Sequence, residues 1–267
     1  MPIVSYVAAP SDGAVWITGA SSGIGRELAL EMARTGWTVA VTARSEDALA
    51  ELKDAASDFS GSIQVYAGDV GDTPLMAAHC ASIAAEYGLA LVVANAGIYL
   101  PQDGLDGDAE AYRKTFDVNL MGTVNVVLPA INVMKVAGQG QIAIVSSVAG
   151  YRGLPTCAAY GASKAALFNF AESLRFDLER AGIRLQVISP GFVDTPATKS
   201  NPFPMPHLIS PQEAVRGIID GLQDRKHFEI SFPKAFVRQL KAIQFLPFNL
   251  YYKLVSKTTG WDQKGKA

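Results

Sequence analysis

Seven short apolar segments recur along the chain, and segments of helical length separate them. The apolar segments cover residues 14–18, 37–43, 63–67, 90–94, 141–146, 184–189 and 228–232. Residues 91–94 and 142–145 are apolar without alternation, which is typical of strands that helices cover on both faces of a parallel sheet. The pattern predicts a doubly wound α/β fold.

In such a fold the carboxyl ends of the strands lie along one rim, where ligands bind. We therefore expect the residues that directly follow the strands to converge on one site. A chain of 267 residues with 49% hydrophobic content can bury a sizeable core. We predict a single domain over residues 1–267.

Two segments depart from the simple alternation. Residues 109–137 have helical character but contain Pro129, which we expect to bend the helix or reset its last turns. Residues 197–210 contain Pro202, Pro204 and Pro206, which exclude a helix or a central strand. We interpret residues 197–225 as a lid region over a substrate; an ordinary surface connection is the alternative.

The charge and the cysteines exclude some classes of function. The formal net charge of −2 gives no general attraction to nucleic acid, so we expect no such partner. Cys80 and Cys157 match no metal-ligand spacing, so we predict free thiols or small core residues and no metal site. The N-terminus lacks the basic region of a secretory signal, and no uninterrupted apolar run is long enough for a membrane span. We expect a cytoplasmic protein.

A glycine-rich run, Thr-Gly-Ala-Ser-Ser-Gly-Ile-Gly at residues 18–25, lies between the first apolar segment and a helix-like segment. A turn of this kind can hold a pyrophosphate, because glycine lets phosphate oxygens approach the backbone and the first amides of the helix are unpaired. The spacing differs from the general dinucleotide fingerprint Gly-x-Gly-x-x-Gly. A turn that serves chain geometry alone is therefore the alternative.

Tyr160 and Lys164 lie four residues apart at the start of an apolar helix, so they share one helix face. Of the nine tyrosines in the chain, only Tyr160 has a lysine four positions later. Taken alone, the pair could also be a solvated surface pair.

Together these features resemble the short-chain dehydrogenase/reductase family over nearly the whole chain. The matching residues, in the order of the family, are 18–25, Asp69, Val70, Asn95, Ala96, Gly97, Asn119, Ser147, Tyr160, Lys164, Pro190, Gly191 and Thr195. The resemblance implies a three-layer Rossmann-type fold with a seven-stranded parallel sheet in the order 3-2-1-4-5-6-7. It also implies a nicotinamide cofactor and hydride transfer between that cofactor and a carbinol or carbonyl carbon.

The resemblance makes Tyr160 the base for oxidation and the acid for reduction. A base near neutral pH needs the tyrosine pKa to fall by roughly 2 to 3 units. A lysine ammonium about 4 Å away could supply roughly 4 kcal/mol toward this, so we expect Lys164 to lower the pKa of Tyr160. Ser147 would orient the reacting oxygen; we prefer it to Ser146 because adjacent strand residues face opposite sides and its spacing to Tyr160 matches the family.

Further roles also follow from the resemblance. Lys164 would bind the nicotinamide ribose, and Asn119 would help to relay protons, unless its amide only satisfies neighbouring backbone groups. The expected cofactor-binding residues are Thr18, Gly19, Ser21, Ser22, Gly23, Ile24, Gly25, Arg44, Asp69, Val70, Asn95, Ala96, Gly97, Tyr160, Lys164, Pro190, Gly191, Val193 and Thr195. Most of these residues have an alternative role as ordinary turn residues.

The second predicted strand indicates which dinucleotide is bound. Members that prefer NAD often carry Asp at the position of Ala43, where a carboxylate binds the ribose 2′-hydroxyl. Arg44 follows and offers a guanidinium suited to a phosphate. We predict NADP(H), with NAD(H) as the alternative if Arg44 only stacks over the adenine.

The C-terminal extension, residues 233–267, is basic and apolar. No acidic residue occurs between Ile230 and Trp261. The extension could cover the substrate pocket, pack against another subunit, or rest on an anionic membrane surface. As pocket walls we expect Leu154, Pro155, Cys157, Phe203, Met205 and Leu208.

These walls suggest an apolar alcohol or ketone as the substrate. We therefore predict an NADP(H)-dependent oxidoreductase of CH–OH donors, such as a carbonyl reductase, that forms a homodimer or homotetramer as members of the family commonly do. A dinucleotide-binding sensor or scaffold without turnover is the alternative, because one fold can host unrelated functions.

Overall fold

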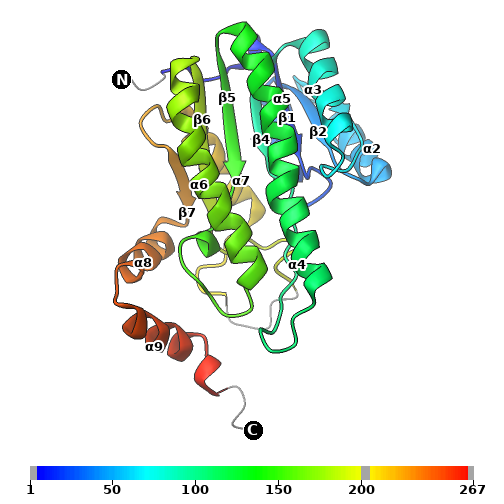
Figure 1. Ribbon diagram of the computed structural model, residues 1–267. Helices are drawn as coiled ribbons and strands as arrows, with labels where there is room; N and C mark the ends of the chain where they lie inside the picture. Colours follow the sequence, from blue (N-terminus) through cyan, green and yellow to red (C-terminus); the bar gives the residue numbers. More distant parts are fainter. Residues whose placement is uncertain (1–4, 200–204, 264–267) are drawn as a thin grey trace.

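A single parallel sheet organises the computed structural model, which describes residues 5–199 and 205–263 (Figure 1). Its strand order is β3-β2-β1-β4-β5-β6-β7. The strands are β1 (Ala14–Thr18), β2 (Thr38–Thr42), β3 (Ser62–Val65), β4 (Leu89–Ala94), β5 (Gly140–Val145), β6 (Ile183–Pro190) and β7 (Glu229–Phe232). The predicted α/β class, all seven strands and their order are confirmed.

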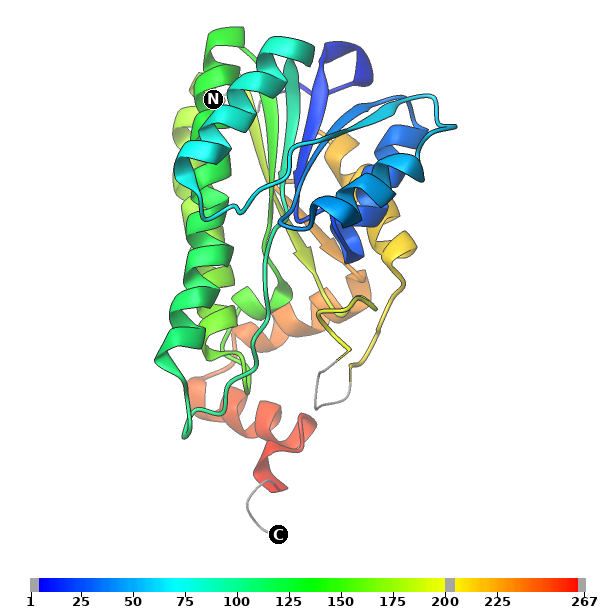
Figure 2. The same cartoon turned by 90° about the vertical axis from the view of Figure 1, so that its right-hand side faces the viewer.

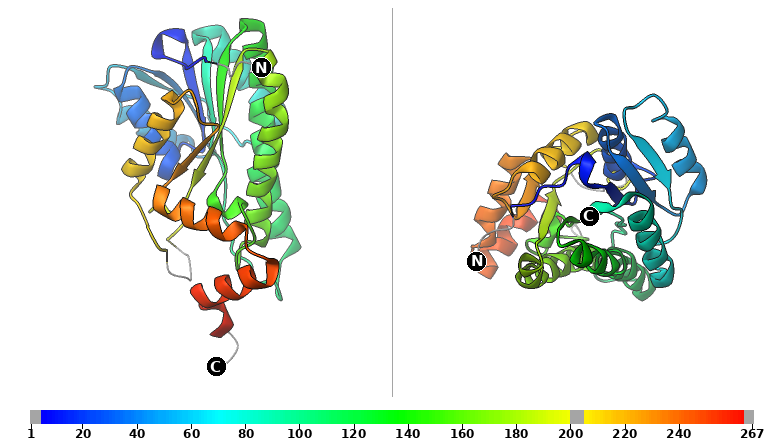
Figure 3. Two further views of the ribbon diagram at one scale, coloured as in Figure 1. Left: turned by 90° about the vertical axis from the view of Figure 1, so that its left-hand side faces the viewer. Right: turned by 90° about the horizontal axis from the view of Figure 1, so that it is seen from above.

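Helices cover both faces of the sheet and enclose one apolar core on each side (Figure 2; Figure 3). One face carries α1 (Gly23–Arg34), α2 (Glu46–Asp54) and α7 (Pro211–Gln223); the other carries α3 (Thr73–Tyr87), α5 (Gly122–Ala137) and α6 (Ala158–Arg180). Successive residues of β1 divide between the cores, since Val15 and Ile17 face one and Trp16 the other. Burial on both faces explains why the central strands are apolar without alternation.

The long helical segment is interrupted earlier than predicted. It consists of α4 (Ala109–Phe116), a π-helical turn (Asp117–Met121) and α5, which continues through Pro129 to Ala137. In the π turn the Gly122 amide donates to the Asp117 carbonyl, five residues back. The helix therefore does not end near Pro129, and its irregular turn contains the fully buried Asn119 instead.

By length and composition, the continuous helix Ala109–Ala137 could cross a membrane. The sequence pattern did not indicate this, because the segment contains no uninterrupted apolar run of that length. The inner face of α5 is buried on the sheet through Val126, Val127, Ala130 and Met134. These apolar residues serve the core.

The lid region that we expected at 197–225 contains two kinds of structure. Its second part is α7, an amphipathic helix whose apolar face belongs to the core beside α1. Only the part before Pro211 is irregular, and a bridge between Val193 and Ile209 ties it to the end of the sheet. A lid role for residues 197–210 stays a prediction; Pro202, Phe203 and Pro204 lie outside the described residues.

Candidate active site

The glycine turn between β1 and α1 presents unpaired amides. Gly19 and Gly23 have φ values of +68° and +56°, in the left-handed region that favours glycine. The Gly19 amide donates to the Thr42 carbonyl at 2.7 Å, which folds the turn back over β2. The side chain of Ser22, the residue before α1, does not cap the helix. The first amides of α1 are therefore available to an anion.

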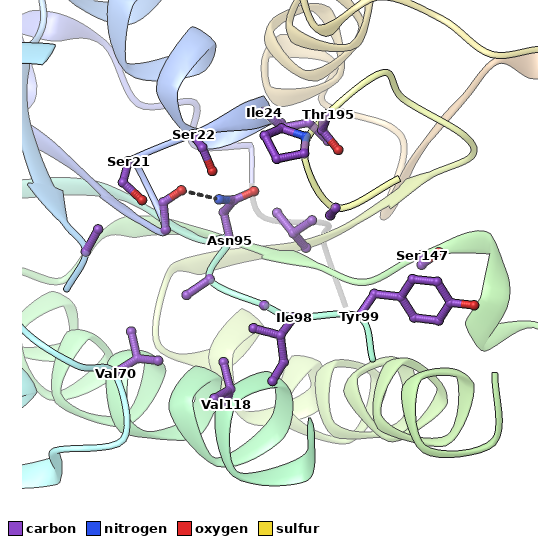
Figure 4. Close-up of a pocket in the computed structure, with 18 of the residues that line it drawn as sticks. Ser21, Ser22, Ile24, Val70, Asn95, Ile98, Tyr99, Val118, Ser147 and Thr195 are labelled. Atoms are coloured by element: carbon purple, nitrogen blue, oxygen red, sulfur yellow. Dashed lines mark hydrogen bonds between the residues drawn. The ribbon is translucent and has the colours of Figure 1, made fainter. Parts of the chain in front are cut away.

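Three residues lock the turn against the end of β4. The Asn95 side-chain amide donates to the Thr18 carbonyl at 2.9 Å and to the Gly19 carbonyl at 3.3 Å. Figure 4 shows the Asn95 side chain pointing toward the turn. The Thr18 hydroxyl oxygen accepts from the backbone amides of Asn95 and Ala96, both at 3.1 Å. Gly25 has to be glycine, because a Cβ there would lie 2.4 Å from the Gly19 carbonyl oxygen.

A cavity of about 390 Å³ runs along the carboxyl ends of the strands beside this turn. Most residues expected from the sequence line it: Gly19, Ser21, Ser22, Gly23, Ile24, Arg44, Asp69, Val70, Asn95, Ala96, Gly97, Ser147, Tyr160, Lys164, Pro190, Gly191, Val193 and Thr195. Three expected residues, Thr18, Gly25 and Asn119, do not line the cavity. They lie behind its wall and hold the wall in place.

Ser147 and Tyr160 meet at one end of the cavity. Ser147 lies two residues after the end of β5; its hydroxyl oxygen accepts from the Ala149 amide at 3.1 Å, and its hydroxyl donates to the Pro190 carbonyl at 3.5 Å. The neighbouring Ser146 hydroxyl donates to the Lys164 backbone carbonyl at 2.8 Å. That bond leaves Ser147 as the serine whose hydroxyl reaches the tyrosine.

Burial controls the charges of Tyr160 and Lys164. Loss of solvent raises the pKa of Tyr160 to about 12, although the hydrogen bond from Ser147 lowers it in part. Burial also lowers the pKa of Lys164 to about 8. The Lys164 ammonium donates to the Val145 carbonyl at 2.8 Å, and its nitrogen lies 5.7 Å from the centre of the Tyr160 ring.

The expectation that Lys164 lowers the pKa of Tyr160 is therefore wrong for this structure. Helical spacing places both side chains on one face, but the ammonium points to a backbone carbonyl and not to the phenol oxygen. Desolvation then outweighs any attraction between them. Tyr160 is a neutral phenol at pH 7, a form that can donate a proton.

Asn119 ties the loop after β4 to the catalytic helix. Its side-chain oxygen accepts from the Ile98 amide at 2.7 Å, and its side-chain nitrogen donates to the Ile98 carbonyl at 3.0 Å and to the Ser163 hydroxyl at 3.1 Å. These bonds match the alternative of an amide that satisfies neighbouring backbone groups. Gly97 lies between this side chain and Lys164, because a Cβ there would be 3.3 Å from Asn119 Oδ1 and 3.4 Å from Lys164 Nζ.

The cavity walls at the Tyr160 end differ from the expected ones. None of the described candidates Leu154, Pro155, Cys157, Met205 and Leu208 lines the cavity, and Phe203 lies outside the described residues. Cys157, which is a free thiol as predicted and buried like Cys80, lies 3.7 Å from the Tyr99 hydroxyl.

Sequence reasoning missed the walls that are present, which include Ile98, Tyr99, Lys114, Val118 and Thr198. The ring of Tyr99 packs edge-on against Tyr160, with 5.0 Å between the ring centres, and its hydroxyl hydrogen-bonds the Thr156 hydroxyl. The sequence signal for Tyr99 was its position, because it is a large side chain two residues after Asn95-Ala96-Gly97, which follow a strand end.

The C-terminal helices hold the segment between Ser147 and Tyr160. α8 (Lys234–Gln244) buries Phe236 and Val237 against Val148. The Arg152 guanidinium donates to the carbonyls of Gln244 and Leu246 at 2.7 and 2.8 Å, in the turn before α9 (Phe248–Thr258).

Tyr251 of α9 completes this attachment. The Arg152 guanidinium lies 4.1 Å from the centre of the Tyr251 ring, and the Tyr251 hydroxyl donates to the Gly153 carbonyl at 2.9 Å. The extension thus contacts the segment between the two catalytic candidates of its own chain.

Comparison with known proteins identifies the family. The family model for short chain dehydrogenases matches residues 13–203, so this chain belongs to the short-chain dehydrogenase family. An uncharacterized oxidoreductase of Myxococcus xanthus is 38% identical over 239 residues, which cover 88% of this chain and 93% of that protein. The chain is thus an oxidoreductase of a family that binds a nicotinamide dinucleotide.

Solved structures agree with this assignment. A short-chain dehydrogenase/reductase from Mycobacterium marinum superposes with a TM-score of 0.76 at 26% identity, covering 83% of this chain and 94% of that one. An alcohol dehydrogenase from the archaeon Thermococcus sibiricus, solved with 5-hydroxy-NADP, gives a TM-score of 0.73 at 25% identity, covering 82% of this chain and 95% of that one.

Substitution of Gly25 by alanine tests the packing of the turn. The new Cβ would lie 2.4 Å from the Gly19 oxygen and 2.5 Å from Asn95 Nδ2, so the turn must shift. We expect Gly25→Ala to lower the free energy of unfolding by about 1–3 kcal/mol and to weaken dinucleotide binding at least about tenfold. Urea unfolding and fluorescence titration with NADPH measure both. Gly104→Ala, where no atom lies within 4 Å of the new Cβ, is the matched control; equal effects in both variants would contradict the packing argument.

The buried lysine predicts a pH dependence of stability. Because the pKa of Lys164 falls from 10.5 to about 8 on folding, the unfolded chain binds this proton more tightly. Between these pH values the contribution of Lys164 to the free energy of unfolding rises with pH. From roughly pH 7.5 to 10 we expect the wild type to gain on the order of 1–3 kcal/mol relative to Lys164→Met. Urea unfolding of both proteins measures it, and a pH-independent difference would refute the lowered pKa.

Proposed function

We propose that this protein reduces apolar ketones or aldehydes with NADPH and, in reverse, oxidises the corresponding alcohols. One observation carries the proposal: Ser147, Tyr160 and Lys164 lie together in the cavity at the carboxyl ends of the strands. The groups around the glycine turn fit a dinucleotide, since the α1 amides are uncapped and Gly19 and Gly23 line the cavity beside them. When bound, the reduced nicotinamide supplies the hydride to the carbonyl carbon.

Residues of the chain supply the proton that the carbonyl oxygen needs. In reduction, the neutral Tyr160 phenol donates its proton to the carbonyl oxygen as negative charge develops there. The Ser147 hydroxyl, which lines the same cavity and lowers the pKa of Tyr160 in part, orients the same oxygen. Lys164 is protonated at pH 7, because its lowered pKa still lies near 8, and its ammonium would bind the nicotinamide ribose. The raised pKa of Tyr160 supports the reductive direction in particular.

Arg44 supports the preference for NADP(H). It is exposed at the end of β2 and lines the cavity, and none of the salt bridges found among the described residues involves it. The preceding residue, Ala43, supplies no carboxylate that would repel a 2′-phosphate. The structurally similar Thermococcus sibiricus enzyme was solved with an NADP derivative.

The substrate and the subunit contacts are part of the same proposal. Ile98, Tyr99 and Val118 give the Tyr160 end of the cavity an apolar lining, which suits an apolar carbonyl compound. We further propose self-association through the outer faces of α5 and α6, where Val136 and Phe176 are exposed.

Replacing the phenol hydroxyl tests the chemistry. We expect Tyr160→Phe to lower kcat for a panel of apolar ketones by about 100- to 10,000-fold, because the proton donor is lost. The affinity for NADPH should change by less than about threefold, since the ring remains. Absorbance assays and fluorescence titration measure the two quantities. Turnover that survives in Tyr160→Phe contradicts the mechanism; a wild type that binds NADPH but reduces none of the ketones would favour a sensor.

Replacing Arg44 tests the cofactor preference. Charge-assisted hydrogen bonds to a phosphate contribute about 1.5–3 kcal/mol, so Arg44→Ala should lower the ratio of kcat/KM for NADPH to that for NADH by about 10- to 100-fold. Arg180→Ala, an exposed arginine in the last turn of α6, is the matched control. An unchanged ratio in Arg44→Ala would remove the argument for NADP(H).

A further inference from the structure

The outer side of the C-terminal helices carries an unusual group of exposed apolar side chains. Phe245, Phe248, Leu250 and Tyr252 are 87%, 73%, 53% and 62% exposed, respectively. Single exposed apolar residues are ordinary, but large ones gathered on one short segment mark an interaction site. We call these four residues, together with the exposed Lys234, Arg238, Lys253 and Lys257, the tail face.

The tail face is positively charged. No acidic residue lies between Ile230 and Trp261. Of the five basic residues in that stretch, Lys241 pairs with Glu229. The salt bridges found among the described residues involve none of the other four. Their charges are therefore not neutralised by neighbours on the same surface.

The same helices are fixed firmly on their inner side. Tyr251 and Val255 are buried in α9, and Phe236 and Val237 are buried in α8. The intramolecular contacts thus use mainly one side of the helices and leave Phe245, Leu250, Tyr252 and the four basic side chains exposed, while the Arg152 guanidinium lies 5.9 Å from the centre of the Phe248 ring. The tail face does not cover the site of its own chain.

The position of the tail face relates it to the cavity. α8 and α9 lie at the end of the molecule toward which the strands point, the end where the cavity opens (Figure 1; Figure 2). Arg152 connects the turn between these helices to the segment between Ser147 and Tyr160. A surface bound by the tail face would lie near the substrate end of the site.

We propose that the tail face docks on an anionic lipid bilayer. Aromatic and leucine side chains beside lysines are the composition of interfacial membrane-binding segments, and basic residues are attracted to anionic headgroups. A second copy of the chain fits less well. A symmetric dimer would place the tail face against itself and bring like charges together. The docking does not depend on the proposed function.

Vesicle sedimentation with the full chain tests this proposal. Phosphatidylcholine vesicles containing phosphatidylglycerol should bind the protein at low salt, and pure phosphatidylcholine vesicles should bind at least about tenfold less. Added salt should weaken the binding to anionic vesicles, because the charges are exposed. Absence of binding at low salt, or equal binding to both vesicle types, overturns the proposal.

Two double variants separate the contributions of charge and apolar contact. Lys253→Glu with Lys257→Glu, and Phe245→Ser with Leu250→Ser, should each weaken binding to the anionic vesicles at least about tenfold. The matched controls Lys53→Glu on α2 and Leu105→Ser in the loop before α4 change exposed residues elsewhere and should leave binding unchanged. Urea unfolding checks that all variants are folded, and loss of binding in the controls overturns the assignment to the tail face.

Light scattering in the absence of lipid tests whether a second copy of the chain, and not a bilayer, binds the tail face. A dimer that forms in the wild type and is lost in Phe245→Ser with Leu250→Ser assigns the tail face to a second copy and overturns the proposal. An oligomeric state that these substitutions do not change, together with their loss of vesicle binding, supports lipid docking.

Discussion

The close approach of the glycine turn to the end of β4 is the constraint on which the site depends. Asn95 donates to two carbonyls of the turn, and Thr18 accepts two amides from the strand end. Because these bonds occupy the polar groups behind the turn, the α1 amides in front stay open to an anion. The absence of a side chain at Gly25 permits the approach. Thr18 and Gly25 therefore shape this anion site without lining the cavity.

Burial determines the pKa values of the catalytic candidates Tyr160 and Lys164. Lys164 is almost fully buried, and a hydrogen bond to the Val145 carbonyl holds its ammonium. Desolvation lowers the pKa of Lys164 to about 8 and raises that of Tyr160 to about 12, so the lysine stands near a change of protonation and the phenol does not. At pH 7 both groups therefore carry their proton, Tyr160 as a neutral phenol and Lys164 as an ammonium.

The sequence predicts what depends on periodicity and order along the chain. Apolar runs without alternation located all seven strands, and residues at strand ends located most of the cavity lining. The directions of side chains could not be predicted. The spacing of Tyr160 and Lys164 predicts that they share a helix face, but it does not predict that the Lys164 ammonium donates to the Val145 carbonyl. The π turn at Asn119 also escaped prediction, because no residue type specifies an extra residue in a helix. The walls near Tyr99 depend on how loops pack, which a local pattern does not encode.

The C-terminal helices show why the role of an apolar, basic segment is ambiguous before its packing is known. Tyr251 and Tyr252 are neighbours in sequence, yet one is buried and bonded to Gly153 while the other is exposed. The contacts of Arg152 and Tyr251 decide which side of α9 faces inward, and Leu250, Lys253 and Lys257 stay exposed. The residues that steady the segment between Ser147 and Tyr160 therefore also determine which surface the extension presents. Any ligand of that surface would bind helices whose inner side contacts the active-site segment.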